Sequence, residues 1–331
     1  MSARPPWIAE QAERLLAQRG HAWLLQGPSG LGQYTLGLDL ARAWLCDDPS
    51  PRGACGRCTS CHAVDVRTHA DLCVLMPETA MQALGWPLPE KAQAEIDDKK
   101  RKPSCEIRVE AMRDAIEFAQ RTSGRGRGKA VLVYPAERMN TVTANALLKT
   151  LEEPPGDVRF VLASESAHLL LPTIRSRCLG HAMRWPEASA ALAWLQGEGV
   201  PADDAAVLLR AAGGRPEEAL AMAQAGRTAR GWSQLPKAVA RGDVSVLADC
   251  SPAQAIDALQ KVCHDLLAVR SGAQPRFFLA GELPAPSSFG ALAAWWKELA
   301  HAQRTAEHPF NAGLMLEALA SRARQALHSA G

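Results

Sequence analysis

The sequence lacks the features that place a chain in a membrane or hold it on DNA by bulk charge. No apolar run approaches the roughly 20 residues needed to cross a bilayer, and the opening stretch MSARPPWIAEQAERLL has no signal-peptide core. Lys and Arg number 37 against 35 Asp and Glu, and this net charge of +2 excludes a histone-like polycation. No repeat of fixed period occurs. We therefore expect a soluble, cytoplasmic protein with no membrane partner.

The 331 residues are 47% hydrophobic and 22% charged, which is typical of a globular protein of two or three domains. Up to about residue 180, helical patterns alternate with short apolar runs, which predicts a parallel sheet covered on both faces. Strands are expected at 21–26, 72–76, 129–134 and 159–163, and helices at 8–19, 36–45, 109–120 and 143–151. After Pro186 the pattern is almost entirely helical. The prediction is an α/β domain at 1–185, a small helical domain at 186–230 and an all-helical domain at 231–331.

A glycine-rich segment joins the first predicted strand to the next helix, as in a phosphate-binding loop. It reads GPSGLGQYT, whereas the motif requires G-x-x-x-x-G-K-[ST]. Gln33 stands in place of the lysine that contacts the β- and γ-phosphates, and Tyr34 in place of the hydroxyl that holds Mg²⁺. Thr35 comes one position too late to replace it. The candidate cofactor-binding residues of this degenerate loop are Gly27, Gly30, Gly32, Gln33 and Thr35.

The acidic motif that completes such a site is also altered. The strand 129–133 is followed by Tyr134 and Pro135 where Mg²⁺-binding carboxylates belong, and Glu137 lies further on. Because both chemical elements are missing, we expect no ATP hydrolysis by this chain alone. Weak nucleotide binding stays open, since the backbone cradle is retained.

Four of the nine cysteines cluster in the segment CDDPSPRGACGRCTSC. Cys46, Cys55, Cys58 and Cys61 have the spacing C-x8-C-x2-C-x2-C, and Cys-x2-Cys pairs let two thiolates reach one ion from a tight turn. Four thiolates satisfy tetrahedral Zn²⁺ with no open position, so we predict a structural zinc module at 46–61. The alternative is four free thiols, which would be a liability on a surface.

Three stretches together resemble one family, the bacterial DNA polymerase III clamp-loader subunits of the AAA+ class. These are the degenerate phosphate loop, the four-cysteine insertion after its helix, and the long run NALLKTLEEPP at 145–155. The run FVLAS at 160–164 is similar to the family's sensor-1 strand, and 171–178 carries the family's Ser-Arg-Cys signature. The resemblance is strong over 1–185 and weaker beyond.

The resemblance implies a AAA+ domain, a helical lid and a C-terminal collar through which five subunits associate. In this family the arginine of Ser-Arg-Cys reaches the ATP of a neighbouring subunit, and Arg177 occupies that position, with Arg175 a weaker candidate. Glu217 falls where the family has its sensor-2 arginine. The implied role is a non-catalytic subunit of the polymerase holoenzyme, a nucleotidyltransferase. Its implied partners are gamma/tau and delta subunits and, through the assembly, the sliding clamp and primed DNA.

Two other functions are compatible with the residues. One is an autonomous AAA+ ATPase with divergent motifs. The other is a zinc-dependent nucleic-acid-binding protein in which Arg125, Arg127, Lys129 and the run DDKKRK at 97–102 contact phosphate. The segment 77–105, rich in proline and charge, is expected to be a solvated loop.

Overall fold

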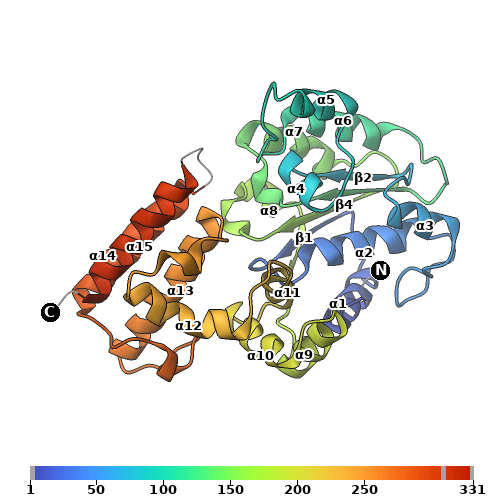
Figure 1. Ribbon diagram of the computed structural model, residues 1–331. Coiled ribbons are helices and arrows are strands. Elements are labelled where there is room, and N and C mark those ends of the chain that lie inside the picture. The colour runs from blue at the N-terminus through green and yellow to red at the C-terminus, as the bar shows by residue number, and fades with distance from the viewer. Residues whose placement is uncertain (1–3, 307–310, 329–331) are drawn as a thin grey trace. The chain divides into compact units, whose positions relative to one another are not determined.

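The computed structural model describes residues 4–306 and 311–328, which form two compact units, 1–185 and 186–331. Unit 1 is a parallel sheet with helices, and unit 2 contains helices alone in its described part (Figure 1). The predicted fold class, an α/β region followed by an all-helical one, is confirmed. The further division of the second region at residue 230 stays a prediction. Over the described residues, no helix is long and apolar enough to span a membrane.

Unit 1 contains five strands, all paired in parallel in the order β2-β3-β4-β1-β5. The strands are β1 (Ala22–Gln26), β2 (Leu72–Leu75), β3 (Lys129–Val133), β4 (Val158–Ser164) and β5 (Leu179–Ala182). The principal helices are α1 (Pro6–Leu16), α2 (Gln33–Leu45), α3 (Thr59–Asp65), α6 (Val109–Gln120), α7 (Thr141–Glu152) and α8 (Pro172–Arg175). Four strands match the sequence prediction within one or two residues. The fifth, β5, has four residues, three of them exposed, and its sequence LGHA contains no apolar run from which a strand could be predicted.

The two faces of the sheet carry different helices, because successive strand residues point to opposite sides. Val131 and Val133 pack with Met112 of α6 and Leu147 of α7 in one hydrophobic cluster. The other face is covered by α2, which approaches so closely that a Cβ on Gly37 would lie 2.6 Å from a methyl group of Leu132. This arrangement fixes the start of α2, and with it the phosphate loop, at the carboxyl end of β1.

The segment 77–105 is not the open loop that its composition suggested. It contains two short helices, α4 (Glu78–Ala83) and α5 (Glu90–Asp97). The Arg101 guanidinium lies between the carboxylates of Glu78 and Glu95, with Nε 2.7 Å from Glu95 Oε2 and Nη2 2.8 Å from Glu78 Oε1. Arg101 therefore joins the two short helices through ion pairs, and the pair with Glu78 spans 23 residues, which the sequence pattern does not reveal.

A buried ion pair anchors the loop that precedes β3. Asp71 is 1% exposed and lies 3.4 Å from the Lys129 ammonium, which also lies 3.9 Å from the ring centre of Phe118. Asp71 accepts hydrogen bonds from the backbone N–H groups of Gly124 (2.7 Å) and Arg125 (2.9 Å). Lys129 is thus buried and paired with Asp71. Its predicted role as a phosphate contact in the nucleic-acid-binding alternative is therefore wrong.

Unit 2 is built of helices around two hydrophobic clusters. The first cluster joins α9 (Ala188–Gly197), α10 (Ala202–Ala211) and α11 (Pro216–Gln224). The second joins α12 (Ala229–Ala240), α13 (Pro252–Arg270), α14 (Phe289–Arg304) and α15 (Ala312–His328). In the second, Trp295 is 2% exposed whereas Trp296 is 39% exposed, so only the first of these adjacent tryptophans belongs to the core.

Candidate functional site

The phosphate loop follows β1 and ends at the first residue of α2, as such a loop must if its N–H groups are to face an anion. Gly30 and Gly32 have positive φ angles of 78° and 92°, a region that glycine enters without strain. Gly27 packs against Met183, whose Cβ would lie 2.9 Å from an added Cβ. The backbone of the loop therefore keeps the shape that the motif predicts.

The side chain at the lysine position folds into the loop itself. Gln33 is 2% exposed, and its Nε2 donates hydrogen bonds to the carbonyl oxygens of Gly27 at 2.6 Å and Pro28 at 2.9 Å. A lysine would extend toward phosphate with a positive charge. Here a neutral amide closes the loop onto its own carbonyl groups.

Aromatic side chains occupy the place of the Mg²⁺-binding groups. The Tyr34 hydroxyl, at the position of the motif's Ser or Thr, accepts a hydrogen bond of 2.7 Å from the indole N–H of Trp86. The Tyr34 ring lies 5.4 Å from that of Tyr134, the residue in the acidic-motif position. Burial raises the pKa of Tyr34, so its hydroxyl stays neutral. Trp86 comes from the 77–105 segment and was not recognised in the sequence, because nothing local to it indicates a contact 52 residues away.

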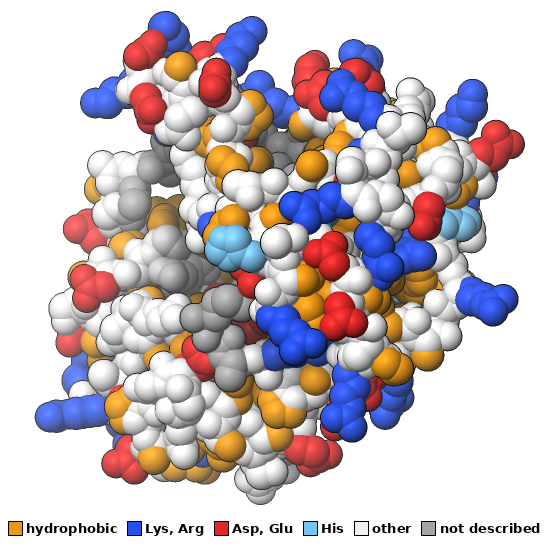
Figure 2. All heavy atoms as spheres, turned by 90° about the vertical axis from the view of Figure 1, so that its right-hand side faces the viewer, with side chains coloured by type: hydrophobic (Ala, Val, Ile, Leu, Met, Phe, Trp, Pro, Cys, Tyr) orange, Lys and Arg blue, Asp and Glu red, His pale blue; other side chains and the backbone are white. Residues whose placement is uncertain are grey.

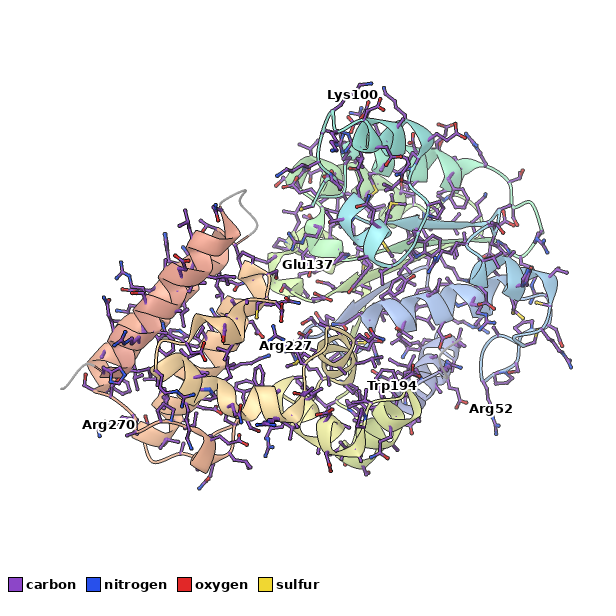
Figure 3. The ribbon with its side chains drawn as sticks, viewed as in Figure 1. Arg52, Lys100, Glu137, Trp194, Arg227 and Arg270 are labelled. Carbon is purple, nitrogen blue, oxygen red and sulfur yellow. The ribbon has the colours of Figure 1, made fainter. Side chains whose placement is uncertain are left out.

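The acidic residue nearest the altered motif, Glu137, is engaged in hydrogen bonds with the end of β4. Glu137, labelled in Figure 3, follows β3 and accepts hydrogen bonds from Ser164 Oγ at 2.8 Å and from the backbone N–H of Glu165 at 3.0 Å. Tyr134 in turn donates its hydroxyl hydrogen to Glu165 at 2.7 Å. These bonds tie the ends of β3 and β4 together.

The four clustered cysteines meet as their spacing predicted. All four Sγ atoms lie within 4.8 Å of one another, with separations of 3.8 Å for Cys46–Cys58, 4.0 Å for Cys55–Cys61 and 3.6 Å for Cys46–Cys61. Tetrahedral zinc with Zn–S bonds of about 2.3 Å requires sulfur separations of about 3.8 Å. The thiol set and its dimensions therefore fit one zinc ion.

Backbone groups around the cluster favour thiolates. Cys55 N–H points at Cys46 Sγ at 3.3 Å, and Cys61 N–H at Cys58 Sγ at 3.4 Å. Hydrogen bonds from the Arg57 and Cys58 backbone lower the pKa of the Cys55 thiol to about 6. Burial has the opposite effect on two other members of the cluster, because it raises the pKa of Cys46 and raises that of Cys61 to about 12. A cation among the four sulfurs would offset this cost of burial, since thiolate is the form that binds metal.

Arg177 follows α8 and is held by its own chain. Its guanidinium forms an ion pair with Glu152 at the end of α7, and its Nη1 donates to the Thr173 carbonyl at 2.8 Å. The side chain is 31% exposed, and that of Glu152 is 47% exposed. An ion pair this accessible to water contributes at most about 1 kcal/mol, so the arginine can easily exchange Glu152 for another anion.

The residue predicted at the sensor-2 position lies in unit 2. Glu217 is in the first turn of α11, and the neighbouring Arg215 donates a hydrogen bond to the Ala212 carbonyl at 2.7 Å.

The parallel sheet and the glycine loop at the end of β1 define a phosphate-loop protein of the AAA+ class whose nucleotide site is altered. The family model described as DNA polymerase III, delta subunit, matches residues 10–185. The chain belongs to this family.

Among known proteins, DNA polymerase III subunit delta' of Pseudomonas aeruginosa is 41% identical over 60% of this chain and 55% of its own length. The Escherichia coli subunit delta' is 35% identical over 66% of this chain and 60% of its own length. Subunits named tau and gamma match about 48% of this chain. The chain thus matches little more than half the length of its delta' relatives. A gamma-subunit-related protein of Thermotoga maritima, 16% identical, aligns with 97% of this chain and 99% of its own at a TM-score of 0.48.

Proposed function

We propose that this chain is a non-catalytic, delta-prime-type subunit of the clamp loader of DNA polymerase III. It joins gamma/tau and delta subunits in a hetero-pentameric ring that opens the sliding clamp and loads it on primed DNA. The observation that carries this proposal is a phosphate loop closed by the amide of its own Gln33, in a chain that belongs to the delta-subunit family.

The absence of catalysis follows from the groups around the loop. Transfer of a γ-phosphoryl group needs a cation and Mg²⁺ to stabilise the charge that develops on it. Gln33 supplies no charge, and Tyr34 and Tyr134 replace the oxygen ligands of the metal with packed rings. On this proposal ATP is neither bound productively nor hydrolysed by this chain, which serves the polymerase holoenzyme through assembly and through a side chain offered to a neighbouring site.

Arg177 is proposed to serve a neighbouring subunit's ATP in trans. An arginine finger stabilises transferring phosphoryl groups through its fork of N–H donors. The side chain lies near the surface, and its partner Glu152 holds it without burying it. The cysteine cluster is proposed to bind a structural Zn²⁺ through Cys46, Cys55, Cys58 and Cys61, which would hold the 46–61 loop in shape.

The decisive experiment replaces Arg177 in the reconstituted complex. We expect Arg177→Ala to lower DNA-stimulated ATP hydrolysis and clamp loading severalfold, because a finger is worth about 10³- to 10⁵-fold at the one site it serves. Assembly should be unaffected, since the exposed ion pair with Glu152 adds little stability. Arg175→Ala, an exposed neighbour on α8, is the matched control.

Two results would contradict the proposal. Unchanged rates with Arg177→Ala, or a larger effect of Arg175→Ala, would refute the trans role. ATP turnover by the purified chain at the rate of an intact AAA+ enzyme would refute the non-catalytic assignment and favour the autonomous ATPase.

A further inference from the structure

The cysteine loop forms one wall of a groove on unit 1 that is lined by none of the phosphate-loop residues and not by Arg177. The groove has a volume of about 910 Å³ and is lined by the ends of α1 and α2, the 49–52 turn, Gly126–Arg127 and the start of β4. The turn is fixed by paired backbone hydrogen bonds of 2.9 Å between Ser50 and Gly53. Arg4 Nη1 supports it by donating to the Arg52 carbonyl at 3.2 Å.

Three arginines from separate segments converge on the groove: Arg52, Arg127 and Arg159. Arg52 lies 3.9 Å from Glu13, and Arg159 lies 3.5 Å from Asp157, both longer than the 2.7–2.9 Å of a charge-assisted hydrogen bond. Within the described part of the chain, no ion pair of Arg127 is found. Arg52, whose side chain is 89% exposed, points away from the ribbon in Figure 3.

The position of Arg127 is set by its loop. It stands between Gly126 and Gly128, which have φ angles of 71° and 80°, and a Cβ on Gly128 would lie 2.5 Å from the Asp157 carbonyl oxygen. The base of the loop is tied to Asp71. The backbone thus presents Arg127 from a fixed turn rather than from a free arm.

Among the aromatic residues, Trp44 lines the groove. Its ring centre lies 4.9 Å from that of the buried Trp23, with the two rings tilted by 32°, and the Arg159 guanidinium lies 5.6 Å from the Trp44 ring centre. A guanidinium stacked on tryptophan adds a flat, cationic surface on which a nucleobase can stack. Figure 2 looks onto the side where the cysteine loop lies, and there Lys and Arg side chains stand among apolar and acidic ones.

We propose that this groove binds single-stranded DNA, with Arg52 and Arg127 contacting phosphates and Arg159 stacking a base. Loose, exposed pairs such as Arg52–Glu13 are worth little, so a phosphate can replace the carboxylate. A cavity of this size holds a short stretch of strand. The carboxylates of Glu13 and Asp157 offset part of the positive charge of the groove, so we expect only micromolar affinity for DNA, the strength of non-specific binding. This binding should depend strongly on salt, because it rests on contacts between arginines and phosphates.

The cysteine cluster would also affect DNA binding by the groove. Residues 49–52 lie between Cys46 and Cys55, so a metal held by the four thiolates would fix the wall that carries Arg52. DNA binding by the groove should therefore depend on the metal as well as on the arginines.

The test measures fluorescence anisotropy of labelled oligo(dT) with the full, zinc-loaded chain over a range of salt concentrations. We expect Arg127→Ala and Arg52→Ala each to weaken binding at least threefold and to lower the salt slope by about 0.7, the value for one phosphate contact on a single strand. Arg19→Ala, an exposed arginine near the end of α1 that does not line the groove, should leave binding unchanged. Removal of the metal should weaken binding about as much as Arg52→Ala does, because the metal would fix only the turn that carries Arg52.

Several outcomes would overturn the inference. These are no binding of oligo(dT) at low salt, an equal effect of Arg19→Ala, or full binding after the metal is removed. Binding of polyglutamate with the same arginine dependence, in place of DNA, would assign the groove to acidic proteins instead. Because the assay uses this chain alone, its failure would leave the proposed place in the ring untouched.

Discussion

Replacing Asp71 by asparagine tests whether one buried carboxylate holds the loop before β3. The variant keeps the side chain's shape but removes the charge opposite the Lys129 ammonium, whose side chain is 5% exposed. Leaving a buried charge without its partner costs roughly 3–5 kcal/mol. The cation–π contact with the Phe118 ring, 3.9 Å from the ammonium, is present in wild type and variant alike and so does not change this difference. We therefore expect Asp71→Asn to lower the stability of unit 1 by about 3–5 kcal/mol.

Hydrogen exchange of the β3 amides at 129–133 measures this loss locally, which matters because the chain has two units. The second variant, Lys129→Met, should restore part of the loss when combined with Asp71→Asn, since it removes the orphaned charge. A loss below about 1 kcal/mol for Asp71→Asn, or no recovery in the double variant, would refute the reasoning.

The same carboxylate has a defined pH dependence. Desolvation alone would raise the pKa of Asp71, but hydrogen bonds from Gly124, Arg125 and Ser123 and the charge of Lys129 together lower it. A carboxyl group with a lowered folded pKa stabilises the protein above its unfolded pKa and loses that contribution as the pH falls through the folded value. In wild type, the β3 amides should therefore become less protected from hydrogen exchange as the pH falls below about 4. In Asp71→Asn the same acidification should reduce this protection less, because the titrating carboxylate is absent.

Two further predictions concern the metal and the nucleotide. Elemental analysis should find one zinc per chain in wild type and in Cys105→Ser, whose cysteine is exposed outside the cluster, but none in Cys58→Ser; equal zinc in all three would contradict the four-thiolate site. Calorimetry with MgATP should detect binding at least tenfold tighter for Gln33→Lys/Tyr34→Thr than for wild type, and tighter still when Trp86→Ala is added. Wild-type binding as strong as that of the double variant would show that Gln33 and Tyr34 do not exclude nucleotide.

Local patterns predicted much of unit 1 because its central strands are buried on both faces and read as continuous apolar runs. The phosphate loop and the cysteine spacing were recognisable for a similar reason, since each motif is a short contiguous segment. The strand β5 was missed because it is a short, mostly exposed edge strand, defined by its pairing with β1 rather than by an apolar run of its own.

Contacts between distant segments could not be predicted. Trp86 reaches Tyr34 from a segment whose composition suggested a loop. Arg52 and Arg127 line one groove only because the fold brings the cysteine turn and the loop before β3 to the same surface. Lys129 shows the converse: a cation in a basic stretch proved to be buried, because its carboxylate partner lies 58 residues earlier. Charge counts alone do not distinguish a contact with solvent or ligand from an internal pair.

On the proposed function, we expect the hydrogen bonds of Gln33 within the loop to reduce the loop's affinity for every anion. A phosphate would enter only after the amide leaves the carbonyl groups of Gly27 and Pro28. Two such hydrogen bonds contribute about 1–3 kcal/mol together, so the open loop makes up roughly one part in 5 to one part in 150 of the population. The affinities for phosphate, sulfate and nucleotide would all be reduced by this same factor. Gln33→Ala would remove it without adding any charge, and would separate the cost of opening the loop from the loss of the lysine.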